Sequence, residues 1–240
     1  MTTSSIDNEE LAKFSLLSEH WWDKDGPLAT LHAINPTRLL FINQHLDVRG
    51  KRILDVGCGG GILTEALVQL GANVTGIDAE SEAIKVAKAH AKAASLPIDY
   101  HNKAIEDFEA PPFDAITCME LLEHTPNPQL IVTHASRLLK EGGYLLASTL
   151  NRTLKAYLSA VIAAEYILGL LPKQTHDYDK FIKPSELAAM ARNANLETSA
   201  LRGMAYNFWN KTASLEDSVA VHYLMAFIKR RGTQNRRVNG

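Results

Sequence analysis

Four of the five residues from 57 to 61 are glycines, and they follow directly after a short apolar run, Arg52 to Val56. Glycines in such a turn let the backbone come close to a ligand, and a following helix offers the N–H groups of its first turn. Dinucleotides and S-adenosylmethionine (SAM) both bind at turns of this kind. A dinucleotide site prefers the pattern Gly-x-Gly-x-x-Gly, but Ile62 stands where the last glycine would be. The turn therefore predicts a cofactor site and argues against a dinucleotide.

Acidic residues stand at or just after the ends of the predicted strands, namely Asp55, Asp78, Asp107 and Glu120. In an open parallel sheet the ligand lies outside the carboxyl ends of the strands. Several carboxylates there would repel a pyrophosphate and would favour a ligand with a sulfonium, an ammonium and a ribose diol. Asp78 follows Gly57 by 21 residues, the spacing at which an acid reaches ribose hydroxyls. Each acid alone is more simply a solvated turn residue, but their joint placement favours SAM.

Glu120, Glu123 and His124 are spaced by three and four positions. If the chain is helical there, the three side chains share one face and could ligate a cation together. Oxygen ligands with open positions suit Mg²⁺, and the histidine makes Mn²⁺ or Zn²⁺ possible. The alternative is a helix-start network in which Glu120 caps backbone amides and His124 is hydrogen-bonded. Spacing does not separate the two interpretations.

The elements that must position these residues alternate along the chain. Residues from Glu9 to Leu46 predict helices broken by the turn Asp23 to Pro27. Strands and helices then alternate strictly along the chain, which implies parallel βαβ units with helices on both faces of the sheet. The predicted strands are 52–56, 73–77, 98–102, 113–119, 144–150, 197–201 and 219–228, and the predicted helices are 62–70, 81–94, 128–139 and 184–193.

Length and composition are those of a single α/β domain with additions. The chain has 240 residues, of which 46% are hydrophobic, and a formal net charge of −2, which argues against a nucleic-acid partner. Two cysteines fit a reducing cytosol better than a disulfide scaffold. The polar, acidic start is unlike a signal peptide, and no apolar run is long enough to span a bilayer. These features predict a cytoplasmic protein.

Several motifs together resemble one family. The glycine turn, Val74 to Asp78 and Thr117 to His124 look like class I SAM-dependent methyltransferases. Further segments are similar, more narrowly, to the ubiquinone-biosynthesis O-methyltransferases, and the resemblance covers nearly the whole chain. These segments are 21–23, 31–38, 148–152, 164–168 and 175–184.

The resemblance implies a Rossmann-like, seven-stranded sheet, mostly parallel, whose last strand, Val219 to Ile228, runs antiparallel. Residues 1–50 are expected to form a helical cap over the cofactor site. Residues 51–240 are expected to form the methyltransferase domain, with an amphipathic insertion at about 152–184.

The resemblance also places cofactor contacts on Arg38, Gly57, Asp78 and Met119. Arg38 would offer a planar fork of donors to the methionine carboxylate, and Met119 would lie against the adenine. Without the resemblance, a surface salt bridge is the simpler interpretation of Arg38. With the residues expected from the glycine turn and the strand ends, the cofactor set is Arg38, Asp55, Gly57, Gly59, Asp78, Asp107 and Met119.

The activity implied is transfer of a methyl group from SAM to phenolic hydroxyls of polyprenylated ubiquinone precursors, at two steps of ubiquinone biosynthesis. A phenol titrates near 10, so a base or a metal must remove or share its proton. The family's dependence on a divalent metal favours Glu120, Glu123 and His124 as ligands. Glu120, His124 or His176 could instead act on the proton. A different small aromatic or quinone acceptor, and a SAM-binding membrane module without activity, are the competing functions.

Apolar residues recur along one side of the segment from Leu154 to Leu171, and four lysines flank it: Lys155, Lys173, Lys180 and Lys183. Such a helix can lie in a membrane interface on anionic lipids, which would suit a substrate with an isoprenoid tail. An ordinary core-facing helix shows the same pattern. The segment therefore predicts, as one of two interpretations, a peripheral position on the inner face of the membrane, with the loop from Gln174 to Asp179 as a lid. The resemblance leaves open an assembly with other ubiquinone-biosynthesis proteins.

Overall fold

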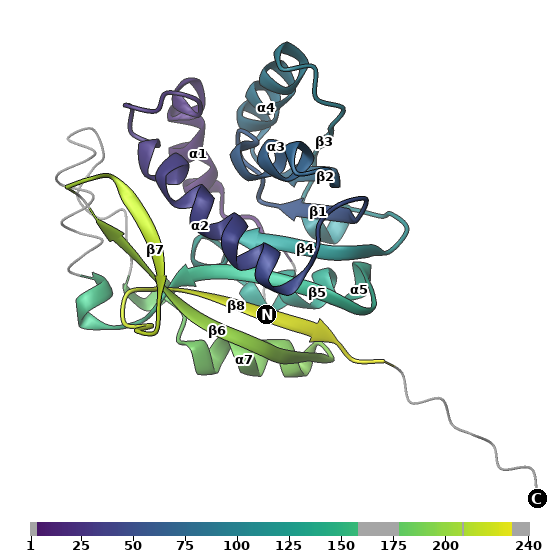
Figure 1. Ribbon diagram of the computed structural model, residues 1–240, viewed down its shortest axis with the longest axis vertical. Helices are drawn as coiled ribbons and strands as arrows, with labels where there is room; N and C mark the ends of the chain where they lie inside the picture. Colours follow the sequence, from purple (N-terminus) through teal and green to yellow (C-terminus); the bar gives the residue numbers. More distant parts are fainter. Residues whose placement is uncertain (1–3, 158–177, 208, 232–240) are drawn as a thin grey trace, which may run out of the picture.

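A mixed β-sheet forms the centre of the molecule (Figure 1). The computed structural model describes residues 4–157, 178–207 and 209–231. Within these residues the sheet has eight strands in the order β3-β2-β1-β4-β5-β8-β6-β7. Their bounds are β1 Arg52–Val56, β2 Asn73–Asp78, β3 Asp99–Asn102, β4 Phe113–Met119, β5 Leu139–Leu150, β6 Leu196–Asn207, β7 Thr212–Glu216 and β8 His222–Lys229.

The first five strands are parallel to one another. Between them lie α3 (Ile62–Gln69), α4 (Ser81–Ala93) and α5 (Pro128–Leu138), and α7 (Pro184–Asn193) precedes β6. Helices α2 (Ala29–His45) and α3 cover one face of the sheet, and α5 and α7 cover the other (Figure 1). The alternation of strands and helices predicted from the sequence is confirmed.

Strand β1 shows why the apolar runs predicted buried strands. Successive side chains of a strand point to opposite faces of the sheet. Ile53 belongs to the same hydrophobic cluster as residues of α2 and α3, and its neighbour Leu54 belongs to the cluster that contains residues of α5 and α7; both are fully buried. A strand covered on both sides must be apolar at every position, which is the continuous pattern seen in the sequence.

The edge of the sheet departs from the seven strands that were expected. Strand β8 is antiparallel to both β5 and β6, as expected for the last strand. Strand β6 is longer than predicted and forms a hairpin with β7, which was not predicted. The sequence of β7 is short and half-polar, so it carries little signal by itself. Its inward residues, Ala213 and Leu215, pack on the same cluster as α2, and this tertiary contact stabilises the extra strand.

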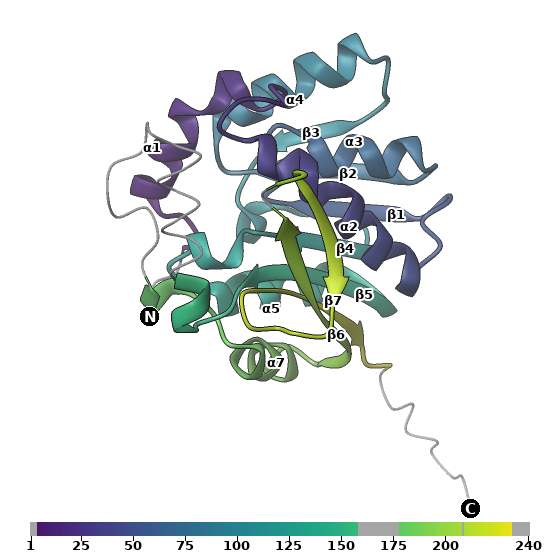
Figure 2. The same cartoon turned by 60° about the vertical axis from the view of Figure 1, so that its left-hand side comes forward.

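The N-terminal residues form α1 (Asn8–Leu16), a short 3₁₀ helix η1 (Ser18–His20) and α2, with the predicted break between η1 and α2. Helix α1 contacts α4 and lies away from α5 and α7, as two views show (Figures 1 and 2). In the part of the chain that the structure describes, no helix is long and apolar enough to cross a membrane.

Candidate active site

A cavity of about 380 Å³ lies at the carboxyl ends of β1, β2 and β4. This volume is within the range of roughly 300–1,000 Å³ that small-molecule sites occupy. Its walls come from the glycine turn after β1, from the ends of β2 and β4, and from α1 and α2. The cavity is therefore at the position that an open parallel sheet predicts for a ligand.

The glycine turn needs its glycines. Gly57 and Gly59 have φ angles of +69° and +52°, a region that other residues rarely adopt. A Cβ on Gly57 would lie 2.9 Å from the Leu121 side chain, and a Cβ on Gly59 would collide with the ring of Trp21. Both glycines line the cavity, as predicted. The turn thus brings bare backbone to the ligand space and leaves no room for side chains.

Asp78 ends β2 and also lines the cavity. Its Oδ2 accepts a hydrogen bond from the Gly59 amide, and its Oδ1 accepts one from the Glu80 amide, both at 2.8 Å. Burial raises the pKa of Asp78 to about 6, although these two amides act in the opposite direction. A carboxylate oxygen can accept more than one hydrogen bond, so Asp78 can still receive two ligand hydroxyls.

Met119 and Trp21 supply apolar walls. Met119 ends β4, as predicted. Trp21 is 8% exposed and lies over Gly59 and Gly60, while Trp22 Nε1 donates to the Gly60 carbonyl at 3.0 Å. Among the residues that the structure describes, Trp21 Nε1 is buried and has no hydrogen-bond partner. A glycine cradle, an acid beside it and an unused indole donor fit a cofactor with a ribose and polar end groups.

Arg38 from α2 is buried and forms an ion pair with Glu120. Glu120 also accepts a hydrogen bond from the Ser148 hydroxyl, and its Oε1 lies 2.7 Å from His222 Nε2. Burial alone would raise the pKa of Glu120, but the charges of Arg38 and His222 dominate and lower it to about 2. A carboxylate with this pKa is a poor proton acceptor at neutral pH. Arg38 and Glu120 both line the cavity, and Arg38 Nε has no partner within the described ranges.

The predicted metal ligands do not share a face. Glu120 stands at the strand end with a φ of +49°, and the helix that follows, η3 (Leu122–His124), is a single 3₁₀ turn. Glu120 therefore points to Arg38, Glu123 accepts the Thr149 hydroxyl at 2.7 Å, and His124 turns toward α1. In the described segments, no three His, Cys, Asp or Glu side chains gather closely enough to hold a metal ion. The expected ligand set does not fit a shared ion in this arrangement.

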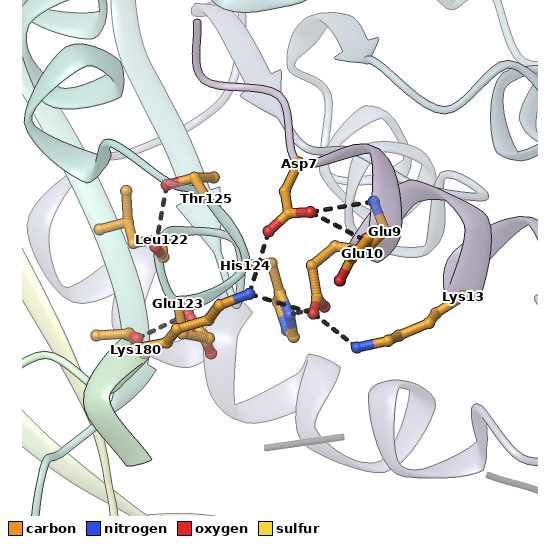
Figure 3. A network of polar contacts seen from close by, with 10 residues as sticks. Asp7, Glu9, Glu10, Lys13, Leu122, Glu123, His124, Thr125 and Lys180 are labelled. Atoms are coloured by element: carbon orange, nitrogen blue, oxygen red, sulfur yellow. Dashed lines mark hydrogen bonds and ion pairs between the residues drawn. The ribbon is translucent and has the colours of Figure 1, made fainter. Parts of the chain in front are cut away.

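His124 meets a residue that the sequence analysis missed. Its Nδ1 lies 3.0 Å from Oε2 of Glu10 on α1, 114 positions away in the chain (Figure 3). Burial alone would lower the pKa of His124, but the hydrogen bond to Glu10 and the charge of Glu123 raise it. His124 and Glu10 both line the cavity. No local pattern could have indicated this pair, because its members are distant in sequence.

Other predicted site residues are placed differently. Asp55 lines the cavity, but both of its oxygens accept threonine hydroxyls, from Thr64 and Thr117, at 2.6 Å. Asp107 is exposed and does not line the cavity, whereas Ala104 and Ile105 before it do, and its cofactor contact stays a prediction. Glu123 is buried away from the cavity lining. Three predicted features lie outside the described residues: His176, residues 158–171 of the amphipathic segment, and residues 174–177 of the lid.

Comparison with known proteins agrees with the fold and the cavity. A family model described as a methyltransferase domain matches residues 30–201. Magnesium protoporphyrin IX methyltransferase of Synechocystis PCC 6803, solved with bound SAH, superposes with a TM-score of 0.68 at 16% identity, covering 92% of this chain and 95% of that one. A SAM-dependent methyltransferase of Methanosarcina mazei has a TM-score of 0.61 at 20% identity, over 80% of this chain and 98% of its own. At these identities the likeness concerns the fold.

Sequence relatives are much nearer. The ubiquinone biosynthesis O-methyltransferase of Chromobacterium violaceum is 52% identical over 226 residues, which are 93% of this chain and 97% of that protein. The protein of the same name from Thiobacillus denitrificans is 51% identical with the same coverage. The resemblance found in the sequence motifs is therefore confirmed, and the chain belongs to the ubiquinone biosynthesis O-methyltransferases, a family of SAM-dependent methyltransferases.

Proposed function

We propose that the protein transfers the methyl group of SAM to a phenolic oxygen of a polyprenylated ubiquinone precursor. One observation carries the proposal. The glycine turn and Asp78, which suit the cofactor, line the same cavity as His124, which suits a proton transfer. The names of the relatives that are 51–52% identical support the ubiquinone precursor as the class of acceptor.

In this proposal the cofactor half of the cavity binds SAM through three kinds of contact. Asp78 accepts the ribose hydroxyls, and Arg38 donates to the methionine carboxylate through its unpartnered Nε. Met119 and Trp21 cover the apolar parts of the ligand. Residues 1–50 act as a cap over the site, which is supported by the residues of α1 and α2 that line the cavity.

The acceptor half must deal with the phenolic proton. Bound SAM supplies an electrophilic methyl group on a sulfonium, and the acceptor oxygen must be deprotonated as it attacks. His124 is the side chain proposed to accept the proton, since Glu120 is held ionised by Arg38 and His222. No step is assigned to a divalent ion, because the expected ligands point to three different partners.

A peripheral position on a membrane surface is also part of the proposal. Leu154 is 69% exposed, and Lys155 beside it is exposed; the two residues follow the end of β5 at Leu150 after a three-residue connection. An exposed apolar side chain next to a cation is suited to an anionic lipid interface. Co-sedimentation with vesicles of anionic and of neutral lipids tests this part. Binding to anionic vesicles that disappears in Leu154→Ser with Lys155→Ser is expected, and binding equal for both lipids contradicts it.

The experiment for the activity uses purified protein, methyl-labelled SAM and short-chain analogues of the ubiquinone precursors. We expect label on the phenolic oxygen of these analogues and little on quinone-ring carbons or on simple catechols. Label on a ring carbon would favour a different acceptor chemistry. Cofactor binding without any labelled product would favour a module that binds SAM without turnover.

A further inference from the structure

Two consecutive tryptophans hold the glycine turn from the side of the N-terminal residues. A Cβ on Gly59 would lie 2.2 Å from the ring of Trp21, and a Cβ on Gly60 would lie 2.4 Å from it, so this ring rests directly on the turn. Trp22 Nε1 donates to the Gly60 carbonyl at 3.0 Å. Glycines lose more conformational freedom on folding than other residues, so a turn of this composition depends on contacts from outside it.

Trp22 is itself held by α4. The imidazole of His90 lies flat on its indole, with ring centroids 3.4 Å apart and planes at 2°. On α4, Val86 comes one turn before His90 and packs in the same hydrophobic cluster as Trp22. Stacked rings stabilise a contact beyond the area that they bury. The position of Trp22 is therefore set by a helix residue, His90, that does not line the cavity.

Glu65 fixes the ring of His90. This residue of α3 is 2% exposed, and its two carboxylate oxygens lie 2.8 and 3.0 Å from His90 Nδ1. A carboxylate only accepts hydrogen bonds, so Nδ1 carries a hydrogen and the ring cannot turn without leaving a buried carboxylate unpaired. Because α3 starts directly after the glycine turn, the contacts run from the turn through Glu65, His90 and Trp22 back to the Gly60 carbonyl.

This closed ring of contacts presents a donor that the protein does not use. Trp21 precedes Trp22 in the chain, so the position of Trp22 decides where the indole of Trp21 lies. His32 Nε2 lies 2.8 Å from the Trp21 carbonyl and further fixes the backbone there. In residues 4–157, 178–207 and 209–231, Trp21 Nε1 has no hydrogen-bond partner, although it is buried and Trp21 lines the cavity. A buried donor is costly unless a ligand satisfies it.

We propose that Trp22 and His90 are positioning residues for SAM, which hold the indole of Trp21 on the glycine turn with its Nε1 in the cavity. The inference rests on the proposed binding of SAM in the cofactor half. Neither residue lines the cavity, so both should act on cofactor affinity and leave the chemical step unchanged. If the tryptophans leave the turn for part of the time, the apparent affinity falls in proportion to the fraction of protein in which they are docked.

Two variants each remove one contact of Trp22. His90→Asn places an amide at the level of Nδ1, which keeps a donor for Glu65 and removes the stacked ring. Histidine and asparagine have similar helix propensities, so α4 should be retained. Trp22→Phe keeps a ring for the stack and removes only the donor to the Gly60 carbonyl.

His101→Asn is the matched control. His101 also lies 2.8 Å from an acid, Asp99, but it is on β3 and does not line the cavity. The double variant Trp22→Leu with His90→Asn, compared with Trp22→Leu alone, shows whether His90 acts through Trp22.

Calorimetry with SAM measures the affinity of each protein. We expect Kd to rise about fivefold in Trp22→Phe and roughly fivefold in His90→Asn, with a wild-type kcat at saturating SAM and no change in His101→Asn. In the Trp22→Leu background, His90→Asn should weaken binding no further. Hydrogen exchange of residues 18–32 in the free protein should be faster in His90→Asn and equal to the wild type in His101→Asn.

The outcomes separate the two proposals. A wild-type Kd in either single variant overturns the role of that residue, and an equal effect of His90→Asn with and without Trp22 overturns the link between them. If Trp22→Leu does not fold, hydrogen exchange decides: faster exchange of residues 18–32 in His90→Asn supports the link, and wild-type exchange overturns it. Wild-type protein that binds SAM but labels no acceptor overturns the proposed function and leaves the role of Trp22 and His90 standing.

Discussion

The two halves of the cavity are built in different ways. The glycine turn and Asp78 of the cofactor half come from consecutive elements, since the turn joins β1 to α3 and Asp78 ends the next strand. The acceptor half joins α1, η3 and η4 (Tyr178–Lys180), which are far apart along the chain. Backbone geometry holds the glycine turn against Asp78, whereas side-chain ion pairs hold the acceptor half together. We conclude that changes in the first half should affect binding, and changes in the second should affect the chemical step.

The largest effect is expected for His124→Gln. Without a proton acceptor in the cavity, kcat should fall by about 10²- to 10⁴-fold, the usual contribution of general acid–base catalysis. Since His124 belongs to the acceptor half, calorimetry should give the wild-type affinity for the demethylated cofactor. An affinity that falls together with kcat would show that the halves are not separable.

For Asp78→Asn we expect the opposite result, a weaker binding of SAM with little change in kcat. An amide loses the charge-assisted hydrogen bonds to two hydroxyls, each of about 1.5 kcal/mol, which together correspond to roughly a 100-fold weaker binding. At saturating SAM the kcat should recover to near the wild-type value. A kcat that stays low at saturation contradicts the division between binding and chemistry.

The affinity for SAM should also depend on pH through Asp78, whose pKa is raised by burial to about 6. Below that pH the carboxyl group of the ligand-free protein is protonated, so the affinity should fall by up to about tenfold for each further unit of acidity. Asp78→Asn should remove this slope. The effect on stability has the opposite sign: the folded pKa exceeds the ordinary value of 3.8, so ionisation of Asp78 lowers the stability as pH rises between these values.

Trp21→Phe tests the unused donor of the cofactor half. The phenyl ring keeps most of the apolar cover over the glycine turn but has no N–H. One hydrogen bond of about 1 kcal/mol predicts an approximately fivefold weaker binding of SAM with unchanged kcat. Equal affinity in both proteins would show that the indole nitrogen does not contact the ligand.

The variant Glu123→Ala tests whether Glu123 has a structural role or is a metal ligand. Its carboxylate accepts a hydrogen bond from the buried Thr149, so the loss should cost about 1–3 kcal/mol of the free energy of unfolding. The dependence of activity on Mg²⁺ should equal that of the wild type. If the activity of the variant no longer depended on Mg²⁺, this result would support the metal ligands that were predicted from the sequence.

The same contrast explains what could be predicted from the sequence. Gly57, Gly59 and Asp78 follow from local rules, because a turn that needs positive φ angles and an acid at a strand end leave patterns within a few residues. The strands could be predicted because burial on both faces requires continuous apolar runs. Strand β7 could not, since its pairing with β6 and its packing on α2 are tertiary effects.

Glu10, Lys180 and His222 were missed for a related reason. Each acts on a residue that is distant in the chain, and each is an ordinary charged or polar residue in its own segment. The shared helical face of Glu120, Glu123 and His124 failed because one residue in the left-handed region moved the start of the helix. Spacing predicts side-chain placement only where the backbone conformation is already known.

A single-turnover experiment with protein in excess over methyl-labelled SAM, and with a short-chain polyprenyl phenol as acceptor, tests the central claim most directly. It measures bound label and transferred label in one sample, for the wild type and for His124→Gln. We predict that both proteins bind the label equally, and that only the wild type rapidly places it on the phenolic oxygen. Transfer at the same rate by both proteins would contradict the account.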